Sequence, residues 1–447
     1  MNRNLGIKLG AVGLLILLLM IPLLMIDGMV SERQRLREGV LEDIASSSSR
    51  AQQITGPILV VPYRKTVREW KTHEKSGQRY VEEREYRDRL YFLPERFAID
   101  GAVSSEARSR GIYQARLYHS DSQVSGHFQV PAQYGISEDF ADYRFEPAFL
   151  SVGISDIRGI ENDLRLRLNG AELPFAAGTA DNLLSNGVHA PLPALDGVNG
   201  QRLDFAFNLK LQGTGSLSIT PVGRDTQVEL RSDWPHPSFV GEFLPQQREI
   251  TAQGFSARWQ TSFFATNLEE VLADCVNRER CQTFAQRYFG VSFVDPVDQY
   301  LKTERAIKYA LLFIALTFAG FFLFEVLKRL AVHPVQYGLV GLSLAMFYLL
   351  LLSLAEHMAF ARAYALAASA CVLLIGFYVS HVLHSWLRGG GFTAALAGLY
   401  AMLYALLSAE DYALLMGSLL VFGLLAAVMV LTRRLDWYGL GKPAVAA

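Results

Sequence analysis

The sequence predicts a membrane protein of the α+β class. It has one N-terminal transmembrane helix, a large β-rich, sandwich-like domain outside the cytoplasm, and a C-terminal bundle of five transmembrane helices. Three observations lead to this prediction. Long apolar runs are confined to the two ends of the 447-residue chain. The middle of the chain carries most of the charges and alternates apolar with polar residues. The basic residues beside the apolar runs are unequally distributed between the two sides of a membrane.

The first apolar run covers residues 9–26 and follows Arg3 and Lys8. It is close to the 20 residues or so that a helix needs to cross a bilayer, and Pro22 near its outer end is its one helix breaker. A cleaved signal peptide would have a shorter apolar core and small residues at a cut site, and neither is present here. We therefore expect an uncleaved signal anchor.

Five further apolar runs follow residue 305, and they predict the spans 309–326, 336–355, 363–382, 392–407 and 412–431. A soluble protein with five buried helices is a weak alternative, because five such runs in succession leave no amphipathic layer to cover them.

The charges in the connecting segments predict the orientation. If the N-terminus is cytoplasmic, the cytoplasmic segments carry eight basic residues, whereas the two short outer loops carry Arg362 alone. The eight are Arg3, Lys8, Lys328, Arg329, Arg388, Arg433, Arg434 and Lys442. Both termini are thus expected in the cytoplasm, with residues 27–305 outside it.

The chain is expected to leave the membrane as a helical stalk. Apolar residues recur at helical spacing from Met29 to Ile44, and the pattern ends in Ser46–Ser49 and a break at Thr55-Gly56-Pro57. The predicted organisation is therefore an anchor and stalk over 1–50, a β-rich domain over 51–305 and a helical bundle over 306–447.

Period-two patterns predict strands in the middle domain. Residues 58–61 form an apolar run typical of a buried strand. Residues 203–211 alternate, pause at Gly213-Thr214-Gly215 and resume at 217–219, which predicts a hairpin with one wet face. Similar patterns predict strands over 111–130 and 164–168. A short helix is expected from Asn267, as its N-cap, through Cys275.

Cys275 and Cys281 lie in the domain outside the cytoplasm, where a disulfide could persist. Six residues along one helix correspond to a rise of roughly 9 Å, which is too far for a disulfide. A bond therefore requires the helix to end near Asn277, and two free thiols are the alternative. Cys371 lies within a predicted span, where packing is the simplest role.

The histidines predict no metal site. His381 and His384 share one helix face, but no third ligand is apparent, and an interfacial polar face is the preferred interpretation. His236 lies in the rigid segment Trp234-Pro235-His236-Pro237-Ser238, for which a structural turn is favoured over a catalytic base.

Sequence motifs for the common catalytic and nucleotide-binding sites are missing, so we expect neither an enzyme nor a cofactor. A net charge of −1 without a basic stripe gives no sign of a nucleic-acid partner. The centres of the six spans lack ionisable residues, which disfavours ion-coupled transport. Glu325 lies near a helix end and could pair with Arg329.

Six blocks of the sequence resemble the CreD family of inner-membrane, cell-envelope integrity proteins. They lie at residues 155–160, 232–239, 254–260, 298–300, 333–352 and 435–438. The resemblance extends from the first apolar run to Tyr438 and is carried by ordered blocks in both the middle domain and the bundle. Cys275 and Cys281 are a departure from the family pattern.

The resemblance implies a bacterial inner membrane, a periplasmic domain, and a stress-response role in envelope integrity linked to Cre two-component signalling. It supplies no catalytic residues. We expect the periplasmic domain to bind an envelope component or a protein partner, while the bundle contacts the lipid bilayer. An exporter or channel formed by the bundle is the alternative, with polar residues such as Ser343, Tyr348, Ser353 and Ser380 along a path. An unrecognised hydrolase is a third.

Overall fold

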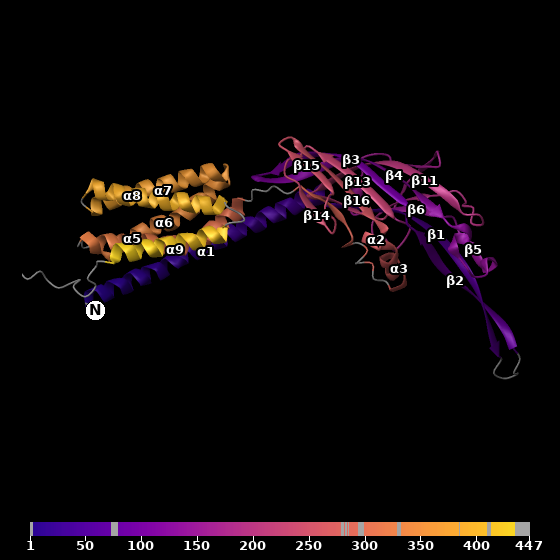
Figure 1. Cartoon of the computed structure of the whole chain (residues 1–447), viewed down its shortest axis with the longest axis horizontal. Coiled ribbons are helices and arrows are strands. Elements are labelled where there is room, and N and C mark those ends of the chain that lie inside the picture. Colours follow the sequence, from indigo (N-terminus) through magenta and orange to yellow (C-terminus); the bar gives the residue numbers. More distant parts are fainter. Residues whose placement is uncertain are drawn as a thin grey trace, which may run out of the picture. The chain divides into compact units, whose positions relative to one another are not determined.

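The computed structural model divides the chain into two compact units (Figure 1). A membrane unit combines residues 1–38 with 297–447, and an outer unit comprises residues 39–296. The residues that the structure describes are 3–72, 79–278, 281, 284, 286–293, 299–328, 332–383, 385–408 and 413–433. The domain boundaries predicted after residues 50 and 305 stay predictions.

Helix α1 (Arg3–Ser47) is one continuous helix of 45 residues with Pro22 inside it. It therefore contains both the first predicted span and the predicted stalk. Its polar end belongs to the outer unit, where Ile44 packs against Ala115 and Leu117 of that unit.

The described part of the outer unit folds into two β-sheets, and Figure 1 labels several of their strands. Sheet A has the strand order β14-β17-β12-β1-β6-β10-β9, with β2 and β5 also paired to β1. Its strands are β1 (Gln52–Thr72), β2 (Arg79–Phe92), β5 (Tyr143–Phe145), β6 (Phe149–Ile154), β9 (Ala176–Ala177), β10 (Gly187–Pro191), β12 (Ser216–Thr220), β14 (Ser238–Gly241) and β17 (Phe289–Ser292).

Sheet B has the strand order β15-β16-β13-β3-β4-β11-β7-β8. Its strands are β3 (Arg96–Arg110), β4 (Tyr113–Val130), β7 (Arg165–Leu168), β8 (Ala171–Pro174), β11 (Gln201–Thr214), β13 (Asp225–Ser232), β15 (Gln247–Thr251) and β16 (Gly254–Ser262). Most neighbours are antiparallel, but β13 runs parallel to β3, and β1 of sheet A runs parallel to β12.

The two sheets share one hydrophobic core, as in a β-sandwich. Strand β1 contributes residues 58–61, which are at most 1% exposed, as their apolar run predicted. Strand β11 contributes every second residue from Leu203 to Leu211. The apolar run thus correctly identified β1, and the period-two pattern correctly identified β11. The predicted break at Thr55-Gly56-Pro57 is an irregularity within β1 and does not end the strand, since pairing with β6 resumes at Ile58.

One prediction about these strands is wrong. Residues 203–219 do not form a hairpin, because β11 pairs with β4 and β7 in sheet B whereas β12 pairs with β1 and β17 in sheet A. Gly215 between them has a φ of +81°, a conformation that glycine adopts readily. The glycine-rich break therefore transfers the chain from one sheet to the other. A local pattern of alternation cannot distinguish this crossover from a turn within one sheet.

Short helices complete the outer unit. They are η1 (Ala132–Gly135), η2 (Phe140–Asp142), η3 (Ile157–Gly159), α2 (Phe263–Thr266) and α3 (Leu268–Arg278). Helix α3 begins directly after Asn267, as predicted, and buries Leu268 and Leu272 in the core of the outer unit.

The membrane unit continues with helices α5 (Gln299–Lys328), α6 (Pro334–Ala355), α7 (Phe360–Val382), α8 (Trp386–Ser408) and α9 (Ala413–Thr432). Within the described residues, five helices are long and apolar enough to cross a membrane, namely α1, α5, α6, α7 and α8. Among the residues that the structure describes, the candidate spans are therefore one N-terminal and four C-terminal helices, rather than the predicted one and five. The last predicted span, 412–431, forms the apolar 20-residue helix α9, which is not among these five candidate spans.

Close packing joins three helices of the membrane unit. Gly341 of α6 faces Leu19 of α1 and Phe318 of α5, and a Cβ atom added there would lie 2.7 Å from the Phe318 ring. Small residues allow membrane helices to approach in this way.

Helix α7 instead presents large apolar side chains on its surface. Leu373 and Phe377 are 68% and 61% exposed, as suits side chains that face lipid.

Candidate functional site

The described surface of the outer unit carries a trough of about 820 Å³, which we call the sheet B trough. Six strands of sheet B contribute to it: β3, β4, β11, β13, β15 and β16. Its lining residues are Ala102, Val103, Ser104, His119, Ser120, Asp121, Glu161, Lys210, Arg231, Ser232, Asp233, Glu249, Thr251, Gln253, Gly254, Phe255 and Ser256. Strands of a packed sheet hold such side chains at fixed spacings, which favours a pre-formed binding site.

One side of the trough holds alternating charges. The imidazole of His119 lies between two carboxylates, with Nδ1 2.9 Å from Glu161 and Nε2 3.5 Å from Glu106. Lys210 on β11 stands opposite Asp121 on β4, and their charged atoms are 3.5 Å apart. All these pairs are at least partly exposed, so each charge can exchange its partner for a ligand at little cost.

The other side contains Arg231 and Asp233 at the end of β13. Arg231 is paired with Asp100 and, at 2.7 Å, with Glu229. Asp233 accepts a hydrogen bond of 2.9 Å from the backbone N–H of Ser105, which holds its carboxylate beside β3. The trough therefore offers separated positive and negative groups to one polar ligand.

The segment Trp234–Ser238 connects β13 of sheet B to β14 of sheet A. The ring of Trp234 is buried under the guanidinium of Arg116, whose Cζ lies 4.2 Å from the ring centre. Its Nε1 donates a 2.8 Å hydrogen bond to the carbonyl of His236. Pro235 and Pro237 flank that histidine, and β14 begins at Ser238. This segment is thus a rigid turn that holds Asp233 at the trough.

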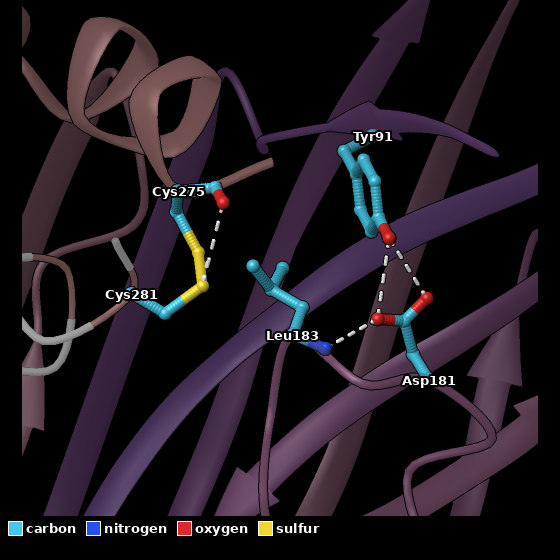
Figure 2. The surroundings of a disulfide bond; sticks show 5 residues. All are labelled: Tyr91, Asp181, Leu183, Cys275 and Cys281. Carbon is cyan, nitrogen blue, oxygen red and sulfur yellow. Dashed lines mark hydrogen bonds between the residues drawn. A yellow bond between two sulfur atoms is a disulfide. The ribbon is translucent and has the colours of Figure 1, made fainter. Parts of the chain in front are cut away.

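A second pocket, of about 760 Å³, lies beside a disulfide between Cys275 and Cys281 (Figure 2). The Cα atoms of the two cysteines are 4.4 Å apart. Cys275 lies in the last turn of α3, which ends at Arg278. A disulfide between residues six apart requires the helix to end near Asn277, and α3 ends one residue later.

Asp181 is the most enclosed charge beside this pocket, with a side chain that is 2% exposed. Its carboxylate accepts hydrogen bonds from Arg89 at 2.7 Å, from the Tyr91 hydroxyl at 3.0 Å and from the Leu183 N–H at 2.6 Å. Figure 2 shows the tyrosine and the backbone N–H converging on this carboxylate. Burial, together with the charge of Asp181, raises the pKa of Tyr91 to about 12.

The membrane unit contains its own buried ionic cluster. Glu325 of α5 is paired with Lys8 of α1 and accepts hydrogen bonds from the Tyr337 hydroxyl at 2.8 Å and the Val332 N–H at 3.2 Å. The pairing predicted for Glu325 involved Arg329, which lies outside the described residues. Sequence reasoning missed Lys8 because 317 positions separate it from Glu325.

None of these places resembles a metal centre. Among the described residues, no group of three or more His, Cys, Asp or Glu side chains could hold a metal ion. The imidazole Nδ1 of His381 donates a 3.0 Å hydrogen bond to the carbonyl of Phe377 in its own helix, and His384 lies outside the described part of the chain. Recognition through charges and hydrogen bonds is the chemistry that the trough can supply.

The fold defines the class: a membrane protein with several candidate spans and a large β-sandwich unit. Two comparisons then identify the family. The family model described as "Inner membrane protein CreD" matches residues 4–438. Inner membrane protein CreD of Escherichia coli strain K12 is 39% identical over 433 residues, which cover 97% of this chain and 93% of the relative. The chain therefore belongs to the CreD family of inner membrane proteins.

Proposed function

We propose that this protein supports the integrity of the cell envelope without acting as an enzyme, by binding a polar envelope component or a protein partner in the sheet B trough. The outer unit lies in the periplasm in this proposal, and the helical bundle holds it at the inner membrane or relays its state. By family resemblance, that state is read by Cre two-component signalling.

The observation that carries the proposal is the arrangement of charge in the trough. His119, Lys210 and Asp121 stand on two adjacent strands, while Arg231 on β13 and Asp233 directly after β13 lie across the trough. A ligand with both amino and carboxylate groups, or a polar peptide, would find partners for both signs of charge. Side chains on sheet strands are already ordered, so little conformational entropy is lost on binding.

Site-specific photocrosslinking in living cells tests this function. A photoreactive amino acid in place of Ser104 or Thr251, which line the trough, is expected to capture a ligand. The same residue in place of Ser109, at the far end of β3, is the matched control. Asp121→Ala together with Lys210→Ala should abolish capture and raise envelope permeability in a deletion strain. Equal capture at all three positions would count against the trough.

The alternative is an exporter or channel formed by the bundle. The structure offers little in its favour, because Ser343 and Ser380 donate hydrogen bonds to the carbonyls of Leu339 and Gly376 on their own helices. Complementation with residues 1–305 separates the two functions. Rescue by this folded, exported fragment would exclude the bundle as the acting part, whereas failure would favour transport or signal relay.

The proposed orientation places both termini in the cytoplasm and residues 27–305 in the periplasm. This requires an even number of spans, with α9 as the sixth. The described side chains of α9 support this, since Leu419, Phe422 and Met429 are each at least 60% exposed, as expected of a helix that faces lipid.

A further inference from the structure

Strand β2 forms an open edge of sheet A. It pairs with β1 from Arg79 to Phe92, and within the described strands it has no other neighbour. Figure 1 shows β1 and β2 running on together beyond the rest of their sheet. Residues 83–88 of β2 are exposed. An edge of this kind presents unpaired backbone groups to a second strand.

The charge sequence of this edge is complementary to that of a second, antiparallel copy of the same strand. The residues in order are Glu83, Arg84, Glu85, Tyr86, Arg87, Asp88 and Arg89. Their signs alternate on each side of Tyr86 and are opposite at equal distances from it. An antiparallel copy of the same strand, centred on Tyr86, therefore places every charge opposite its counter-charge.

In this register Glu85 faces Arg87 of the second copy, Arg84 faces Asp88, and Glu83 faces Arg89. Each pair occurs twice because of the two-fold symmetry. Directly opposite residues of antiparallel strands share one face of the sheet and approach closely, so each pair can make contact. The two copies of Tyr86 meet at the symmetry axis.

Neighbouring registers lack this match. Moving the axis by one residue places Glu85 opposite itself in one direction and Arg87 opposite itself in the other. Like charges directly opposite each other destabilise a sheet. Charges on an edge strand commonly prevent pairing, but here they prevent it in the adjacent registers and permit it in one.

We infer that the β2 edge binds the β2 edge of a second copy of this chain, which joins sheet A of the two copies in a symmetric dimer. The existing contacts do not oppose this. The pairs Arg68–Glu83 at 3.0 Å, Arg84–Glu82 at 3.4 Å and Arg64–Glu85 at 4.0 Å are largely exposed and contribute little. Asp88 accepts a 3.3 Å hydrogen bond from the Tyr63 hydroxyl, which leaves its carboxylate further lone pairs for a new partner. Arg89 binds Asp181 through one nitrogen, which leaves other donors of its guanidinium for a new carboxylate.

Cysteine crosslinking of the full-length protein in native membranes tests the register. The background is Cys371→Ala, which removes the free cysteine of the described chain. Tyr86→Cys is expected to form a disulfide-linked dimer, because the two Cα atoms would be about 5 Å apart. Arg84→Cys is the matched control, since its two copies would be roughly 14 Å apart. Arg84→Cys co-expressed with a differently tagged Asp88→Cys should crosslink.

Charge reversal provides an independent test. Glu85→Arg or Arg87→Glu alone turns two attractive pairs into repulsive ones, and each should weaken the association on the order of tenfold. The double variant restores opposite charges and should recover the dimer. Equal crosslinking at positions 84 and 86, a partner at 86 other than this chain, or a double variant as weak as the single variants would overturn the inference. None of these outcomes depends on whether a ligand binds in the sheet B trough.

Discussion

At the scale of single residues, Asp156 ties the end of α1 to the start of β1. Its carboxylate accepts hydrogen bonds from the Arg50 N–H at 3.2 Å and from the Arg158 side chain at 2.6 Å. Arg158 also donates a 2.7 Å hydrogen bond to the carbonyl of Ser46. The hydrogen bond from Arg158, followed by those of the backbone, lowers the pKa of Asp156 to about 2 from its ordinary value of 3.8.

Asp156→Asn should therefore lower the free energy of unfolding by roughly 1.5–3 kcal/mol at pH 7. Because the pKa is lower in the folded state, this stabilisation is complete above pH 4 or so and is lost as the pH falls towards 2. Thermal unfolding of the purified protein should show a gap between wild type and variant that closes on acidification. Asp163→Asn, whose side chain is 77% exposed, is the control and should change stability by less than about 0.5 kcal/mol. A gap independent of pH would contradict the assignment.

Asp181 makes a second prediction for a single residue. Asp181→Asn replaces a buried acceptor with an amide whose N–H₂ faces donors, and it leaves Arg89 without its counter-charge. We expect a loss of about 3 kcal/mol in the free energy of unfolding. Tyr91→Phe removes one hydrogen bond to the same carboxylate and should cost about 1 kcal/mol. Thermal unfolding of both variants measures the two losses in the free energy of unfolding. Equal losses would show that the Arg89–Asp181 ion pair does not contribute.

At the scale of elements, the ion pair between Lys8 and Glu325 joins α1 to α5. Their side chains are 22% and 8% exposed. Removing one partner of a buried pair leaves the other charge uncompensated, whereas removing both leaves none. Lys8→Met and Glu325→Gln should each lower the thermal stability of the detergent-solubilised protein substantially.

The double variant supplies the control for that prediction. Its loss of stability should be smaller than the sum of the two single losses by at least about 1 kcal/mol, which is the coupling expected of residues in contact. Additive losses in this double-mutant cycle would show that the two side chains do not interact.

At the scale of the whole molecule, the number of spans decides on which side the C-terminus lies. With α9 as a sixth span, a fluorescent protein fused after residue 447 should be cytoplasmic and fluoresce. Alkaline phosphatase fused after residue 408, behind five spans, should be periplasmic and active. Phosphatase activity in a fusion after residue 447 would instead mean that α9 does not cross the membrane.

Much of the fold could be predicted because it depends on local pattern. Apolar runs near 20 residues long identified the five candidate spans, since a membrane helix satisfies its backbone hydrogen bonds within itself. Alternation identified β11, and the apolar run at 58–61 identified the buried part of β1. The rigid segment around Trp234 was also visible as a turn, although its role beside the trough was not.

The sequence by itself therefore determined the location of the spans, the β-rich nature of the outer unit and the family. Only the tertiary structure decided that β12 leaves sheet B for sheet A, that six strands meet at the trough, and that Lys8 pairs with Glu325. The physical reason is distance along the chain. Period and composition are properties of neighbouring residues, whereas Asp181 and Arg89 are 92 positions apart and meet only because the sheets bring them together.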